Sequence, residues 1–88
     1  MTRDQELRHE VLTQAKAVGL SIALSVERLT KQARRAGFDY SPQEINEACI
    51  FLEEQGFLAR IPDPATGVVL WKINSKGVLH CEQNGIEG

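Results

Sequence analysis

Apolar residues recur at helical spacing in the first part of the chain. Residues 3–18 repeat them every three or four positions, and Gly19 follows. Residues 26–36 do the same after the polar Ser25 and stop at Gly37. Such spacing places apolar side chains on one helix face, and Gly commonly follows a helix end. Each stretch therefore predicts a helix with one buried face. The predicted inward positions are Leu7, Val11, Leu12, Ala15, Val18, Val26, Leu29, Ala33 and Ala36.

The third helix has the strongest start signal in the chain. Ser41 stands before Pro42, and Glu44 completes an S-x-x-E spacing. This predicts a capping box, in which the Ser and Glu side chains satisfy backbone N–H groups of the first turn. Gly56 marks the end of this helix. The predicted inward stripe is Ile45, Ala48, Cys49 and Leu52.

After Gly56 the pattern changes to strand formers. Residues 57–61 (FLARI) and 68–73 (VVLWKI) flank PDPATG, whose prolines and glycine require a loop. This predicts a β-hairpin. The alternating segment 20–24 could add a brief strand. A short last helix is expected to start at Asn74 or Ser75, before a frayed tail at 84–88.

The chain of 88 residues has room for one domain, residues 1–88. With 42% hydrophobic and 25% charged residues it has the composition of a folded globular protein. No apolar run approaches the ~20 residues of a membrane span, and the polar start does not resemble a signal peptide. We therefore expect a cytoplasmic protein without a membrane partner.

The two cysteines carry no metal-binding or disulfide spacing. Cys49 lies on the predicted inward stripe, where a small buried side chain is expected. His80 and Cys81 are adjacent, so their helical side chains diverge, and no partner ligands are evident. Ser-His-Asp and Cys-His arrangements and phosphate loops are also missing from the sequence. We expect neither an enzyme, a metal site nor a cofactor.

The net charge of −2 is unevenly spread. Residues 1–40 hold seven Lys or Arg and five Asp or Glu, whereas residues 41–88 hold three and seven. A nucleic-acid footprint would therefore depend on the first half or on the hairpin. Ordinary solvated helix faces fit this small asymmetry equally well.

The order of these elements resembles a winged helix-turn-helix domain. The stretch SVERLTKQARRAGFDYSPQEINEACIFLEEQGFLARI is similar to the helix-turn-helix and first wing strand of that superfamily, and WKINSKGVLHCE to its second wing strand and closing helix. The resemblance implies a mainly α fold with a small β-hairpin: a three-helix core, a two-stranded wing and a short C-terminal helix. More narrowly, the chain resembles the small ArsR-like winged-helix proteins of Mu-like phages and prophages. It lacks the Cys and His clusters of metal-sensing relatives.

The resemblance implies a DNA-binding transcriptional regulator. In this superfamily the third helix enters the major groove, the second crosses the backbone, and the wing reaches phosphate or the minor groove. Carried onto this chain, the base-reading residues are Gln43, Asn46 and Glu47. The implied phosphate contacts are Arg28, Lys31, Arg34, Arg35, Arg60 and Lys72. A homodimer is expected, because symmetric half-sites multiply the contacts of a small domain.

The charge favours a different interpretation. The exposed face of the third helix carries Glu and no cation, and the pI is about 5.6, whereas DNA-binding domains are usually basic. A winged-helix module that binds a protein partner is therefore the alternative. It would use the third helix or the wing, through exposed Ile50, Val68 and Leu70.

Overall fold

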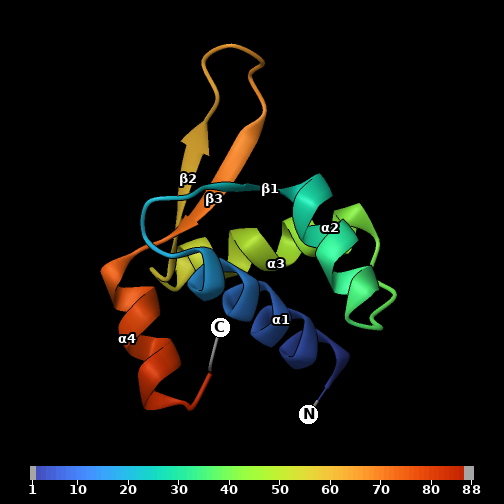
Figure 1. Cartoon of the computed structure of the whole chain (residues 1–88), viewed down its shortest axis with the longest axis vertical. Coiled ribbons are helices and arrows are strands. Elements are labelled where there is room, and N and C mark those ends of the chain that lie inside the picture. The colour runs from blue at the N-terminus through green and yellow to red at the C-terminus, as the bar shows by residue number, and fades with distance from the viewer. Residues whose placement is uncertain (1, 87–88) are drawn as a thin grey trace.

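The computed structural model describes residues 2–86 and contains four helices and three strands within them. Helices α1, α2 and α3 come first, and the hairpin β2–β3 projects beyond them (Figure 1). The elements are α1 (Arg3–Val18), β1 (Leu24–Ser25), α2 (Val26–Arg35), α3 (Pro42–Glu54), β2 (Leu58–Pro62), β3 (Val69–Ile73) and α4 (Ser75–Gln83). The predicted architecture of a three-helix core, a wing and a closing helix is confirmed.

The start of α3 is the predicted capping box. Ser41 Oγ accepts from the Glu44 N–H at 3.2 Å, and Glu44 Oε1 accepts from the Ser41 N–H at 3.1 Å. Pro42 occupies the first turn, where its missing N–H costs no hydrogen bond. A second capping box, which was not predicted, starts α1 at Thr2 and Gln5.

The short link contributes β1 at its end, at Leu24–Ser25. The sheet has the order β1-β3-β2 and is antiparallel throughout, so β3 is the central strand. Leu24 pairs with Trp71 on one side of β3, and Arg60 pairs with Trp71 on the other. The link therefore anchors the hairpin to the helical part of the fold.

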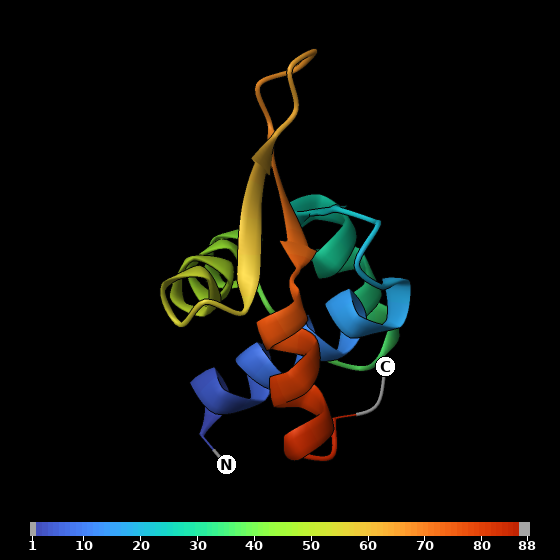
Figure 2. The same cartoon turned by 90° about the vertical axis from the view of Figure 1, so that its left-hand side faces the viewer.

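Both wing strands start one residue later than predicted, and β2 also ends one residue later. β2 includes Pro62, which a strand tolerates at the edge of a sheet, where no partner needs its missing N–H. We call β2, β3 and the loop 63–68 the wing. In Figure 2 the wing stands between α3 and α2 and extends away from the helices.

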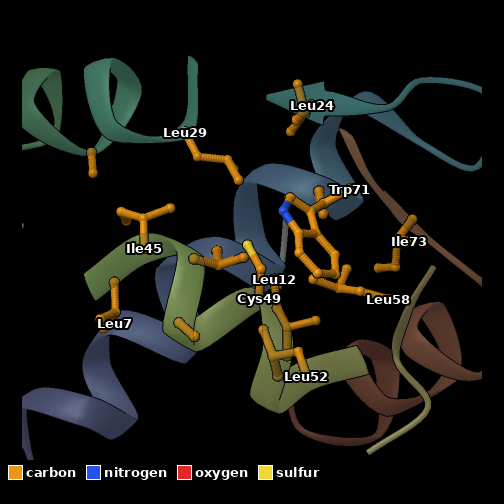
Figure 3. Packing of buried hydrophobic residues seen from close by; sticks show 14 of the residues in the cluster. Leu7, Leu12, Leu24, Leu29, Ile45, Cys49, Leu52, Leu58, Trp71 and Ile73 are labelled. Atoms are coloured by element: carbon orange, nitrogen blue, oxygen red, sulfur yellow. The ribbon is translucent and has the colours of Figure 1, made fainter. Parts of the chain in front are cut away.

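The core is a single cluster of side chains from α1, α2, α3, α4 and all three strands (Figure 3). The predicted inward positions of α1 and α3 are buried or half-buried. Trp71 is 2% exposed and lies within this cluster. In α2 the predicted inward position Ala36 is wrong, because Ala36 is exposed. Thr30 is buried, and its hydroxyl is satisfied there by donating to the Val26 carbonyl at 2.8 Å.

Helix α4 closes the fold by packing on α1. Asn74, rather than Ser75, is its N-cap: Asn74 Oδ1 accepts from the Gly77 N–H at 2.8 Å. The Asn74 amide also donates to the Gly56 carbonyl at 2.7 Å, which joins α4 to the start of the wing.

The expectation of a frayed tail is wrong at Ile86. This side chain is 6% exposed in the core, and its backbone carbonyl accepts from Lys16 Nζ at 3.1 Å. The apolar side chain returns to α1 after the turn at Gly85, whose φ is 68°. Residues 87–88, the rest of the predicted tail, lie outside the described residues. No helix in the described part of the chain is long and apolar enough to cross a membrane.

Candidate nucleic-acid interface

The basic residues of α2 face away from the core. Arg28, Lys31, Arg34 and Arg35 are all exposed, as expected for the polar side of an amphipathic helix. Lys31 Nζ pairs with Glu27 at 3.1 Å, one turn earlier. The three arginines form no ion pair within residues 2–86. This face of α2 therefore offers three guanidinium groups to an anionic partner.

The predicted base-reading residues lie in the first half of α3. Gln43 and Glu47 are exposed and Asn46 is half-buried. The Gln43 amide donates to Glu47 Oε1 at 3.4 Å, across one helical turn. Both side chains are exposed and form no other side-chain hydrogen bond within residues 2–86. Such amides can bond adenine, and a carboxylate can accept from cytosine N4.

Two of the four glutamates of α3 are paired with cations of the same chain. Arg3 of α1 bonds Glu44, with Nε to Oε2 at 3.1 Å. Arg60 of β2 bonds Glu53, with Nη2 to Oε1 at 2.9 Å. Arg3 is far from Glu44 in the sequence, and Arg60 is separated from Glu53 by the turn after α3. The sequence pattern therefore did not reveal these pairs. Glu47 and Glu54 form no ion pair in the part of the chain that the structure describes.

The two predicted cations of the wing have different surroundings. Arg60 is held by Glu53 and stacks on the Trp71 ring, with Cζ 5.2 Å from the ring centroid. Lys72 is half-buried on β3 and forms no ion pair within residues 2–86. The loop 63–68 contains Asp63 and no Lys or Arg. The end of the wing therefore supplies no positive charge.

The apolar surface differs from the expected one. Ile50 is half-buried against the core and Leu70 is also half-buried, so these two residues are wrongly predicted as exposed. Ile50 packs against the core cluster, and Leu70 lies on the central strand between Ser25 of β1 and Ile61 of β2. Val68 is 50% exposed, as predicted. Four other apolar side chains are exposed that were not predicted to be so. These are Leu20, Ile22, Phe51 and Leu79.

The two cysteines and His80 take part in packing. Cys49 and Cys81 are buried. Burial raises the pKa of the Cys49 thiol to about 12 and also raises that of Cys81, so both thiols are protonated at neutral pH. The His80 ring stacks on Phe57, with 4.1 Å between the ring centroids. Among residues 2–86 there is no group of three or more His, Cys, Asp or Glu that could hold a metal.

No protein-family model and no curated protein matches the chain. Solved structures match it. A transcriptional regulator from Clostridium thermocellum covers 97% of this chain and 84% of its own, with a TM-score of 0.75 and 13% identity. Wild-type apo MarR from E. coli covers 92% of this chain, with a TM-score of 0.71 and 20% identity. A mutant of ZitR from Lactococcus lactis covers 90%, with a TM-score of 0.68 and 16% identity.

The chain spans about half the length of two of these structures: 56% of MarR and 49% of ZitR. At these identities the likeness defines the fold. The chain has the winged helix-turn-helix fold, mainly helical and with a three-stranded antiparallel sheet.

Proposed function

We propose that this protein is a small winged-helix DNA-binding transcriptional regulator. One observation carries the proposal: Arg3 and Arg60 pair with Glu44 and Glu53 of α3, while the arginines of α2 form no ion pair within residues 2–86. Two of the negative charges of α3 are thus neutralised by cations of the same chain. The cations of α2 can then act on a polyanion. The fold and the regulator from C. thermocellum support the same function.

In this proposal the two helices have separate roles. Arg28, Arg34 and Arg35 contact phosphates, which gives affinity without sequence preference. Lys31 joins them when it leaves Glu27, an exposed pair of small energetic value. Lys72 adds a contact from the wing. Residues of α3 read the base edges in the major groove, and these are Gln43, Asn46 and Glu47.

We further propose that the protein acts in the cytoplasm as a homodimer on a two-fold symmetric site, and that it belongs to the small phage or prophage type. A single domain of this size makes few base contacts, and a second copy doubles them. The phage assignment rests on the resemblance of the sequence motifs. The dimer can be tested by comparing the stoichiometry of the complex on one half-site and on two.

The proposal is tested by titrating a mixed-sequence duplex at low ionic strength, where phosphate contacts are strongest. Replacing Arg34 and Arg35 with Gln should weaken binding to all duplexes. The magnitude of the slope of log K against log salt should decrease by about 0.9 for each lost phosphate contact. Lys76→Gln, on α4 and away from α2 in Figure 1, is the matched control and should change neither quantity. Absence of binding by the wild-type chain would disprove the function.

A protein-binding module is the second candidate. It is favoured by the unpaired carboxylates Glu47 and Glu54 and by Val68, which is 50% exposed at the wing. A basic protein partner would fit this surface. In that case Glu47→Lys should abolish capture of the partner, and no duplex should shift the amide resonances of α2 or the wing at low salt.

A further inference from the structure

We propose that Arg60 is a positioning residue: it fixes the orientation of the wing on α3 through Glu53 and Trp71, and it is not one of the phosphate contacts. The sequence grouped Arg60 with the phosphate-binding cations, but its contacts favour this other role. The inference rests on the proposed function, in which α3 and the wing meet the same duplex.

The salt bridge between Arg60 and Glu53 is bidentate, with two hydrogen bonds. Arg60 Nε donates to Oε2 at 3.1 Å, and Nη2 donates to Oε1 at 2.9 Å. This side-by-side geometry fixes both the distance and the angle between the two groups. Glu53 lies in the last turn of α3, and Arg60 is the third residue of β2. The pair therefore joins α3 directly to β2, the next element along the chain.

The other side of the guanidinium rests on Trp71. Arg60 and Trp71 are cross-strand partners, so their side chains share one face of the sheet. The Arg60 Cζ lies 5.2 Å from the centroid of the ring, within the range of a cation–π contact. Trp71 itself is 2% exposed in the core. Arg60 is thus held between the end of α3 and a buried side chain of β3.

Arg60 marks the point where the hairpin leaves the core. Leu58, two residues earlier on the same face, is buried, while Pro62, two residues later, is exposed. The base of the wing is already held, because the Asn74 amide donates to the Gly56 carbonyl. The strand β3 is also held further along, where Leu24 and Ser25 of β1 pair with Trp71 and Leu70. The contacts of Arg60 add an anchor on the other side of the hairpin: they tie the edge strand β2 to α3 and so fix the wing relative to that helix.

The same geometry reduces the value of Arg60 as a phosphate contact. Paired with Glu53, it forms a group of zero net charge, which adds little attraction for a polyanion. To bind Arg60, a phosphate would have to displace the Glu53 carboxylate, which already forms two hydrogen bonds with it. The three arginines of α2 face no such competitor within residues 2–86.

Replacing either partner tests the inference, with a mixed-sequence duplex as the probe. Arg60→Gln and Glu53→Gln should each weaken binding by up to about fivefold, the effect of losing a partly exposed ion pair. Neither should change the salt slope. A phosphate contact predicts different results: Arg60→Gln would lower the slope by about 0.9, and Glu53→Gln would strengthen binding by removing a negative charge.

Two further variants separate charge from geometry. Arg60→Lys keeps the charge but cannot form the two-pronged bond, so it should bind as weakly as Arg60→Gln. An affinity and slope like those of the wild type would overturn the inference. The exchange Glu53→Arg with Arg60→Glu restores the ion pair but not the cation–π contact with Trp71, so it should recover part of the binding lost in Arg60→Gln. Arg35→Gln is the control that must lower the slope.

A readout without DNA tests the orientation itself. Trp71 is the only tryptophan of the chain, so its indole N–H resonance reports the wing directly. Arg60→Gln and Glu53→Gln should shift this resonance in the same direction, and an unchanged resonance in both would overturn the inference. If the wild-type chain binds no duplex, the proposed function fails, and the indole resonance alone decides whether Arg60 positions the wing. If the wild type binds but Arg60→Gln lowers the slope, this inference alone fails.

Discussion

The Arg3 guanidinium of α1 donates to both carboxylate oxygens of Glu44 in the first turn of α3, at 3.1 and 3.3 Å. It also donates to the Asp39 carbonyl at 2.9 Å. One side chain thus connects the start of α1 to the turn before α3 and to the helix itself. The contact holds the end of α3 that carries Gln43 and Asn46, the residues proposed to read bases.

This pair predicts a loss of stability in acid. The bond from Arg3, and then that from the Ser41 N–H, lower the pKa of the Glu44 carboxyl from its ordinary 4.5. Its contribution to stability is therefore present above the unfolded pKa and is lost as the pH falls through the folded value. We expect Glu44→Gln to be less stable than the wild type at pH 7, with a difference that disappears in acid.

The measurement is a series of urea midpoints from neutral to acidic pH. Glu54→Gln, which alters an exposed carboxylate without an ion pair within residues 2–86, is the control and should differ little from the wild type at any pH. A Glu44→Gln difference that stays constant down to the lowest pH would contradict the prediction.

Tyr40 predicts a loss of stability in alkali. Burial, and then its hydrogen bond to Glu6, raise the pKa of Tyr40 from 10.0 to about 12. Between these values the unfolded chain releases the phenolic proton while the folded chain keeps it, so the free energy of unfolding falls as the pH rises. Tyr40→Phe should lack this part of the decline.

Tyr40 is the only tyrosine in the chain, so tyrosinate absorbance measures its ionisation directly. The titration midpoint of the folded protein should lie near pH 12. In urea the midpoint should return to about 10, the ordinary value for Tyr. A midpoint near 10 in the folded protein would disprove the effect of burial.

Gly77 in α4 should not tolerate a side chain. A Cβ at this position would lie 2.3 Å from the Phe57 carbonyl oxygen and 2.7 Å from Ile73 Cγ1. Ala favours a helix over Gly by about 1 kcal/mol, but overpacking costs about 1–3 kcal/mol. We therefore expect Gly77→Ala to destabilise the fold in chemical denaturation. Ser75→Ala, at an exposed position of the same helix, should be nearly neutral.

The division of roles between helices predicts a specific effect at Gln43. If its amide bonds a base, Gln43→Ala should relax preference at one base pair by about 1–3 kcal/mol and leave the salt slope unchanged. Selection of bound duplexes from a randomised pool measures this. Arg35→Gln is the converse control, since it should lower the salt slope and preserve the selected sequence.

Local sequence patterns were enough to predict the order and type of the elements. Helix starts at Ser25 and Ser41, and the loop between two stretches of strand formers, depend on local chemistry: side chains that cap N–H groups and residues that break regular structure. The buried stripes of α1 and α3 followed from helical spacing for the same reason. Local signals of this kind need no knowledge of the rest of the chain.

Which charges are paired depends on the packing of the elements. Arg3 meets Glu44 across 41 positions and Arg60 meets Glu53 across a turn, and Ile86 returns to the core beside Lys16. Such contacts depend on how helices and strands pack, because the backbone brings together side chains that no spacing rule connects. The apparent acidity of α3 was therefore a property of the sequence, and its partial neutralisation by Arg3 and Arg60 is a property of the fold.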